Sequence, residues 1–184
     1  MIEKPHILDT DFISSFAWAD SIYLLEKLYF EKMIMLDIVK EELTRIPNRI
    51  PHIWERIKPA IGRGNIIELS ISPLDERIVK EYSLLRKTGK LGSGEAAVMA
   101  YARFHGGIVC SNNIRDVKHY CLRNNLSFCT VALSMFQAYK QGLIDREKGN
   151  SIWQIFLKKK RKVHFSDFQS VIQCYSSGNG LEQK

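Results

Sequence analysis

Short apolar runs alternate along the chain with longer amphipathic segments. The short runs have the length and composition of buried β-strands, and they occupy residues 5–9, 32–36, 65–71, 107–111 and 126–130. The longer segments repeat apolar residues every three or four positions, which predicts helices over residues 20–30, 38–46, 74–87, 94–104, 114–125 and 130–142. A further helix is expected to begin near Phe12.

This alternation predicts an α/β protein, with a parallel sheet covered by helices on both faces. In such folds, ligands bind beyond the carboxyl ends of the strands, near the point where the strand order reverses. We expect residues 1–145 to form this unit, residues 146–175 to add helices to the same domain, and residues 176–184 to be a disordered tail.

Positive charge is concentrated near the C-terminus. Of the net charge of +7, residues 146–184 contribute eight Lys and Arg against three Asp and Glu. Such a segment suits a polyanion such as nucleic acid, although a solvated helix end has the same composition. Five consecutive cations follow the apolar run 151–157, and we expect them to bind phosphates without reading sequence. They are Lys158, Lys159, Lys160, Arg161 and Lys162.

The four cysteines show no C-x-x-C spacing, and no Cys/His cluster has the spacing of a zinc site. We therefore expect reduced thiols and no structural zinc. No apolar run approaches membrane-spanning length, and the N-terminus has no uninterrupted apolar stretch, so a cytoplasmic protein without membrane contact is expected.

Acidic residues recur where predicted strands end or helices begin. Asp9 and Asp11 follow the first apolar run, where a carboxylate either caps the next helix or needs a cation. In the helix from 38 to 46, a periodicity of 100° per residue places Glu42 inside the apolar arc, which also contains Ile46. Glu41 falls outside that arc and can pair with Arg45 on the surface.

Two later segments supply further candidates. Glu95 opens a helix that is apolar nearly all round, so it is expected to be buried, and Gly92 and Gly94 before it permit a tight turn and close backbone approach. After the fourth run, Ser111 or Asn112 could cap a helix whose first turn contains Asp116. From the sequence, Asp116 faces either solvent or the cleft above the sheet.

Carboxylates without accompanying His or Cys ligands make a hard-oxygen site, which suits Mg²⁺ or Mn²⁺. Divalent ions of this kind activate water and stabilise the leaving oxygen in phosphodiester cleavage. The chain contains neither a G-x-x-x-x-G-K-[ST] nucleotide loop nor a G-x-S-x-G elbow.

Over residues 5–145 the sequence resembles the PIN-domain family of metal-dependent ribonucleases, which includes many bacterial toxins. The motifs that carry the resemblance are ILDTD, IVKEEL, LGSGEAAVMAYA, IVCSNNIRDVKHY and TVALSMFQAYKQGLI, in this order. The resemblance implies a three-layer α/β/α fold around a parallel sheet of about five strands. It also implies an endoribonuclease dependent on Mg²⁺ or Mn²⁺, with RNA as substrate, and it leaves open an antitoxin protein and a homodimer as partners.

By position in these motifs, Asp9, Glu42 and Glu95 would bind metal and serve in catalysis. The remaining ligand would come from the segment after the fourth strand. Many family members have an Asp there, whereas this chain has Asn113, a neutral ligand, which leaves Asp116 as the substitute in both roles.

Two alternatives remain open. LDTD also matches the Asp-x-Asp motif of haloacid-dehalogenase-type phosphatases, but residue 13 is Ile where that motif usually has Thr or Val, and Glu42 would have no role. The other alternative is a catalytically degenerate PIN-like module that binds nucleic acid or protein, for which Asn113 is the main argument.

Overall fold

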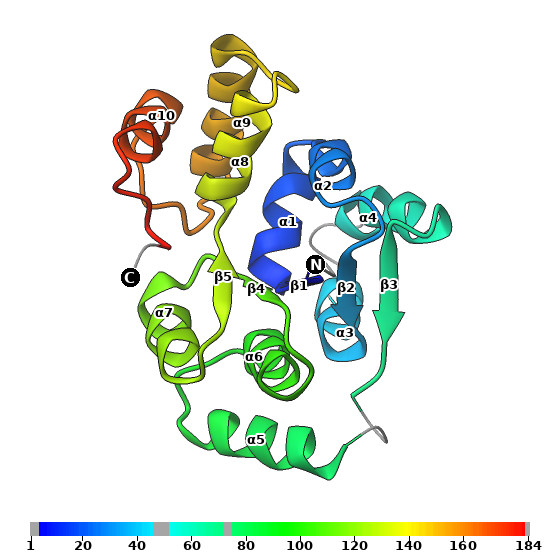
Figure 1. Cartoon of the computed structure of the whole chain (residues 1–184). Helices are drawn as coiled ribbons and strands as arrows, with labels where there is room; N and C mark the ends of the chain where they lie inside the picture. Colours follow the sequence, from blue (N-terminus) through cyan, green and yellow to red (C-terminus); the bar gives the residue numbers. More distant parts are fainter. Residues whose placement is uncertain (1–3, 46–51, 72–74, 183–184) are drawn as a thin grey trace.

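The computed structural model describes residues 4–45, 52–71 and 75–182 (Figure 1). All five predicted strands form, each inside its predicted run. They are β1 (His6–Leu8), β2 (Met33–Leu36), β3 (Ile66–Leu69), β4 (Ile108–Cys110) and β5 (Ser127–Cys129). The strands make one parallel sheet in the order β3-β2-β1-β4-β5, which confirms the predicted α/β class and gives a Rossmann-like fold.

Helices occupy the connections between strands and the C-terminal segment. Within the described residues they are α1 (Thr10–Trp18), α2 (Ile22–Leu28), α3 (Asp37–Thr44), α4 (His52–Gly62), α5 (Glu76–Lys87), α6 (Ser93–His105), α7 (Ile114–Arg123), α8 (Val131–Lys140), α9 (Arg146–Lys158) and α10 (Phe168–Ser176). Ile46 and Leu74, each at one end of a predicted helix, lie outside the described residues. No described helix is long and apolar enough to cross a bilayer.

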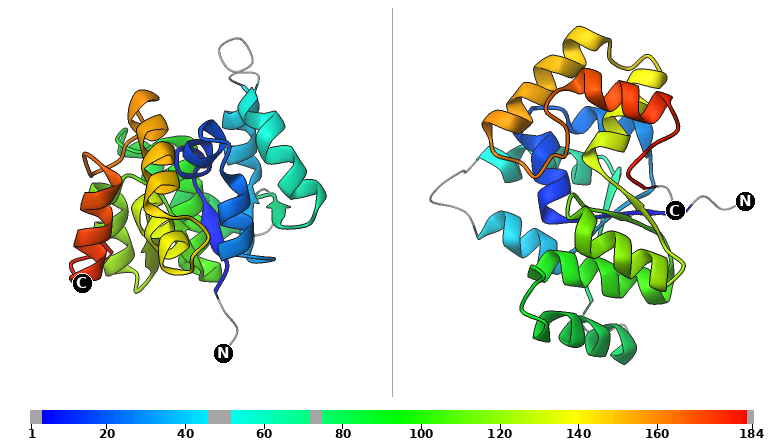
Figure 2. Two further views of the ribbon diagram at one scale, coloured as in Figure 1. Left: turned by 90° about the horizontal axis from the view of Figure 1, so that it is seen from above. Right: turned by 90° about the vertical axis from the view of Figure 1, so that its left-hand side faces the viewer.

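The helices form a layer on each face of the sheet. Figure 1 shows α3, α6 and α7 on one face, with α5 packed outside α6, and α1, α2, α4 and α8 on the other. Figure 2 shows the C-terminal helices α9 and α10 on the side away from α5, where they pack against α8. The expected C-terminal helices therefore form and pack against the helix that follows the last strand.

The helix α4 was not predicted from the sequence, although Ile53, Ile57 and Ala60 recur at helical spacing and are buried. This helix contains Pro59, which lacks a backbone N–H donor, and tertiary contacts with α1 and α2 hold the segment helical despite it. In the tail from 176 to 184, Ser176 ends α10 and Glu182 accepts a hydrogen bond from the hydroxyl of Tyr175 at 2.8 Å. Residues 183 and 184 lie outside the described residues.

The strand order reverses between β1 and β4. The chain adds β2 and β3 on one side of β1, then crosses to add β4 and β5 on the other. In the register, Leu8 is level with Cys110, so the residues that follow them, Asp9 and Ser111, leave the sheet side by side. This is the position at which parallel α/β sheets bind ligands.

Candidate functional site: an acidic pocket at the strand ends

A pocket of about 160 Å³ opens at the carboxyl edge of the sheet. Its lining is polar, and half of the lining residues are acidic. The residues are Asp9, Thr10, Asp11, Glu42, Gly92, Glu95, Asn113 and Lys162. Four of the five residues predicted as metal ligands therefore line one pocket, and the fifth, Asp116, touches it through Asn113.

Asp9 lies at the bottom of this arrangement, with only 5% of its surface exposed. Its Oδ1 accepts a hydrogen bond from the backbone N–H of Thr10 at 2.7 Å, so it caps α1, and its Oδ2 lies 3.1 Å from the hydroxyl of Ser111. Burial, reinforced by the charges of Glu95 and Asp11, raises the pKa of Asp9 to about 8. The side chain of Asp9 thus caps α1 and also lines the pocket.

Glu95 lies beside Asp9 and is nearly as buried, as predicted. Its Oε1 is 3.3 Å from the Ser111 hydroxyl, and its Oε2 accepts a hydrogen bond from the side-chain amide of Asn113 at 3.1 Å. Burial raises the pKa of Glu95, while the amide of Asn113 and the charge of Lys162 oppose that rise. Because the Ser111 hydroxyl has one proton, it can donate to only one of the two carboxylates at a time. The carboxylates of Asp9 and Glu95 therefore lack a second hydrogen-bond donor or a cation between them.

The two glutamates of α3 separate as the helical arc predicted. Glu41 is exposed and pairs with Arg45 at 2.8 Å. Glu42 is half-buried, and its carboxylate accepts hydrogen bonds from the hydroxyl of Thr10 and from the backbone N–H of Gly94, the latter at 2.9 Å. A Cβ at Gly94 would lie 2.6 Å from Glu42 Oε2, which explains the need for glycine there. Glu42 thus links α1, α3 and the start of α6.

Asn113 ends the turn after β4 as the N-cap of α7. Its amide Nδ2 donates to Glu95 and to Asp116, both at 3.1 Å, so it bridges two carboxylates. Asn112, expected as a possible cap of α7, instead accepts a hydrogen bond from the backbone N–H of Val131 at the start of α8. The uncharged amide of Asn113 thus donates hydrogen bonds at a position where an aspartate carboxylate could only accept them.

The basic segment divides into two parts. Lys158, Lys159 and Lys160 are exposed, although the ammonium of Lys159 lies 4.1 Å from the ring centre of Trp18. The next two residues turn toward the acidic pocket. Arg161 and Lys162 approach the carboxylate of Asp11 at 3.6 and 3.7 Å, and Lys162 lines the pocket itself.

Three contributors to the pocket were not assigned a role in it from the sequence. Thr10 holds Glu42, Ser111 joins Asp9 to Glu95, and Lys162 brings a cation to the carboxylates. Thr10 and Ser111 lie at the ends of predicted strands, so their positions in the sequence could have indicated a place in the pocket. No local pattern indicated that Lys162 returns to the first helix.

The donor set fits a hard divalent cation, because the lining offers carboxylate, amide and hydroxyl oxygens and no described His or Cys. As the side chains stand, however, no group of three or more His, Cys, Asp or Glu among the described residues could hold an ion. Glu42 is engaged by Thr10 and Gly94, and Asp11 by the two cations. A third carboxylate can therefore join Asp9 and Glu95 only if a side chain such as Glu42 or Asp11 turns inward.

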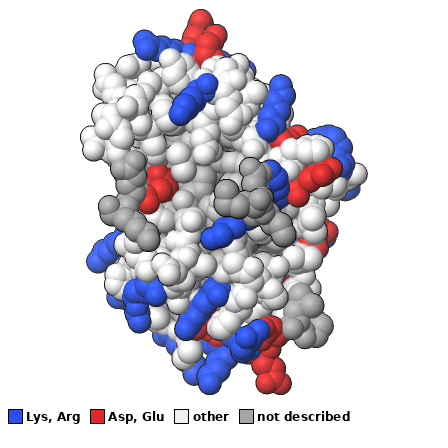
Figure 3. All heavy atoms as spheres, viewed as in Figure 1, with Lys and Arg blue, Asp and Glu red and all other residues white. Residues whose placement is uncertain are grey.

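On the face seen in Figure 3, Lys and Arg side chains are spread over much of the surface among fewer acidic ones, rather than gathered in one patch. No protein-family model, curated protein or solved structure matches the chain. The choice of a function therefore depends on the chemistry of the acidic pocket.

Proposed function

We propose that the protein is a metal-dependent endoribonuclease of PIN type, which hydrolyses RNA phosphodiester bonds at the acidic pocket. The observation that supports this most is the placement of Asp9 and Glu95 around one shared hydroxyl, at the strand-order reversal of a parallel sheet. A buried carboxyl with its pKa raised to about 8 is typical of functional sites rather than of structural caps.

In this proposal Asp9 and Glu95 hold Mg²⁺ or Mn²⁺, with Glu42, Asn113 and Asp116 completing or supporting the ligand set. The ion, when bound, polarises the phosphate and lowers the pKa of a water molecule. The chain's own cations have a separate task. Lys162 sits among the carboxylates and Arg161 beside them, where they can neutralise the phosphates of RNA on either side of the cleaved bond.

The role as a toxin, with an antitoxin protein as partner and a possible homodimer, follows from the resemblance to PIN-domain toxins alone. Its test is growth arrest on expression of the chain. Arrest by the wild type and normal growth with Glu95→Gln would support the role.

RNA cleavage by the purified protein tests the enzymatic proposal. Unstructured RNA should be cut in Mn²⁺ and left intact in EDTA. Glu95→Gln should lower the rate by on the order of 100-fold or more, as expected for a group acting at the reacting centre. Glu41→Gln is the matched control, because Glu41 is exposed and its ion pair with Arg45 lies on the surface. Equal loss in both variants would count against the pocket.

A second candidate function is a degenerate module that binds RNA without cutting it. It is favoured by Asn113 at the position of a carboxylate and by the engagement of Glu42 with Thr10 and Gly94. RNA binding with no cleavage in Mn²⁺ would select this function. It would also predict that Glu95→Gln binds RNA as well as the wild type.

A further inference from the structure

A second pocket, of about 240 Å³, adjoins the acidic pocket, and we call it the side pocket. Thr10 and Asp11 line both pockets, so the two cavities are neighbours along the first turn of α1. The other lining residues come from α1, α3, α4 and the end of α9 with the residues after it. They are Ser14, Trp18, Leu43, Ile53, Lys159 and Arg161.

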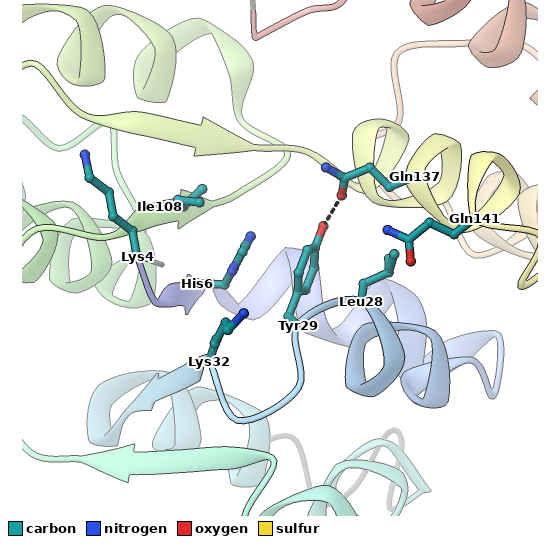
Figure 4. A pocket seen from close by; sticks show the side chains of 8 residues that line it. All are labelled: Lys4, His6, Leu28, Tyr29, Lys32, Ile108, Gln137 and Gln141. Atoms are coloured by element: carbon teal, nitrogen blue, oxygen red, sulfur yellow. Dashed lines mark hydrogen bonds between the residues drawn. The ribbon is translucent and has the colours of Figure 1, made fainter. Parts of the chain in front are cut away.

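A larger pocket, of about 340 Å³, lies at the opposite edge of the sheet (Figure 4). It opens where β1 and β4 begin, since His6 and Ile108 are level in the register and both line it. The acidic pocket lies at the other ends of the same strands. Of these two cavities, the side pocket is therefore the one that can receive a nucleotide next to a bond held in the acidic pocket.

The side pocket contains apolar surface of the kind that holds a flat ring. Leu43 and Ile53 are buried, and the indole ring of Trp18 is half-buried. Proteins that bind single-stranded RNA hold splayed bases on aromatic and apolar side chains in this way. The cavity is smaller than the roughly 300 to 1,000 Å³ of sites for drug-sized ligands, so it suits one base rather than a whole nucleotide.

Two cations border this apolar surface. The ammonium of Lys159 lies 4.1 Å from the ring centre of Trp18, and the guanidinium of Arg161 donates a hydrogen bond to the hydroxyl of Ser14 at 3.0 Å. Because Lys159 is exposed and its stem is flexible, it can leave the ring for a phosphate while a base takes its place. Arg161 also approaches Asp11 at 3.6 Å, which places this cation at the junction of the two pockets.

We propose that the side pocket binds one base of the RNA substrate, from a nucleotide next to the cleaved bond, with the adjoining phosphates at Lys159 and Arg161. This proposal rests on the proposed ribonuclease function and adds a requirement to it. The RNA has to be single-stranded at that nucleotide, because a paired base enters a pocket only after costly unpairing and unstacking.

Binding of two RNA hexamers in EDTA tests the proposal without cleavage. One hexamer contains adenine or uracil bases, and the other is abasic, so it keeps every phosphate and lacks every base. The wild type should bind the base-containing hexamer about tenfold or more tightly than the abasic one. AMP and UMP, which offer one phosphate group each, should bind more weakly than the base-containing hexamer. In Mn²⁺, a single abasic nucleotide should slow cleavage most at the bond beside it.

Tryptophan variants assign the difference to the side pocket. Trp18→Leu should weaken binding of the base-containing hexamer about fivefold or more and leave binding of the abasic hexamer unchanged. Trp54→Leu is the matched control, because Trp54 is also half-buried and lies 5.6 Å from a lysine ammonium, that of Lys40, but does not line the side pocket. This variant should bind both hexamers as the wild type does.

Fluorine NMR of the wild type labelled with 5-fluorotryptophan locates the base independently of any effect of a variant on folding. The Trp18 resonance, assigned by its loss in Trp18→Leu, should shift when the base-containing hexamer is added and stay in place with the abasic one. An unmoved resonance at saturation with the base-containing hexamer would overturn the proposal.

Four binding results would also overturn it: equal affinity for the two hexamers, equal weakening in the two tryptophan variants, a mononucleotide that binds as tightly as the hexamer, or no saturable binding up to about 1 mM. Failure of the ribonuclease function is a different result. RNA would then stay intact in Mn²⁺, while the preference for the base-containing hexamer and the shift of the Trp18 resonance persist.

Discussion

Replacing Asp9 by Asn should stabilise the metal-free protein at neutral pH while removing a residue the proposed activity needs. The side chain is 5% exposed and lies close to Glu95 and Asp11, so its ionised form is costly in the folded state. Asparagine has nearly the same shape and no charge. It can still accept from the N–H of Thr10, and its amide can donate to the hydroxyl of Ser111.

The magnitude follows from the shift in pKa. The pKa of Asp9 is raised from 3.8 to about 8 in the folded protein, so between these values the unfolded chain releases a proton that the folded chain keeps. The free energy of unfolding therefore falls as pH rises from about 4 to about 8. At pH 7 the accumulated cost is about 4 kcal/mol, at about 1.4 kcal/mol per pH unit, before local relaxation reduces it. We expect Asp9→Asn to gain about 1 to 4 kcal/mol at pH 7 and almost nothing at pH 4.

Urea denaturation in EDTA at several pH values between 4 and 8 measures this gain. The exposed Asp20, which among the described residues has a single ion pair, a 4.0 Å contact with Arg56, gives the control variant Asp20→Asn, which should track the wild type at every pH. A variant at position 9 that is less stable than the wild type at pH 7 would refute the reasoning. So would a gain that does not change with pH.

Further changes test other parts of the structure. Asn113→Asp replaces the amide that donates to Glu95, so it should lower the free energy of unfolding in EDTA by about 1 to 3 kcal/mol and increase the stabilisation by Mn²⁺, both measured by denaturation with and without the ion. In the wild type, Mn²⁺ should raise the melting temperature more at pH 8 than at pH 6, because the ion competes with protons for the carboxylates; equal shifts would contradict this. Gly149→Ala would bring a Cβ to 2.1 Å from the ring of Phe168, so it should cost about 1 to 3 kcal/mol in urea denaturation, whereas Gly62→Ala, with open space around it, should not.

Much of the fold could be predicted from local sequence. The five strands are short runs rich in apolar residues. Burial of these runs holds β1, β2, β4 and β5 in the sheet, whereas only Ile66 is fully buried in the edge strand β3. The exception is α4, where Pro59 interrupts a segment whose apolar residues have helical spacing and which α1 and α2 hold in place. Tertiary contacts, rather than intrinsic helix propensity, stabilise such a segment.

The site was predictable only in part. Helical periodicity separated Glu42 from Glu41, and strand ends indicated Asp9 and Asn113, because parallel strands end at a common edge. The approach of Lys162 could not be predicted. It depends on the end of α9, where Lys160 adopts a φ of 53°, a conformation uncommon outside glycine, and redirects the chain toward Asp11.

The most direct test of the central claim, that the acidic pocket is a divalent metal site, is a crystal soaked in Mn²⁺ and measured for anomalous scattering. We predict one strong anomalous peak in the pocket, about 2.2 Å from carboxylate oxygens of Asp9 and Glu95, with Glu42 or Asp11 turned toward it. A fully occupied Mn²⁺ elsewhere, with no peak between Asp9 and Glu95, would contradict the claim.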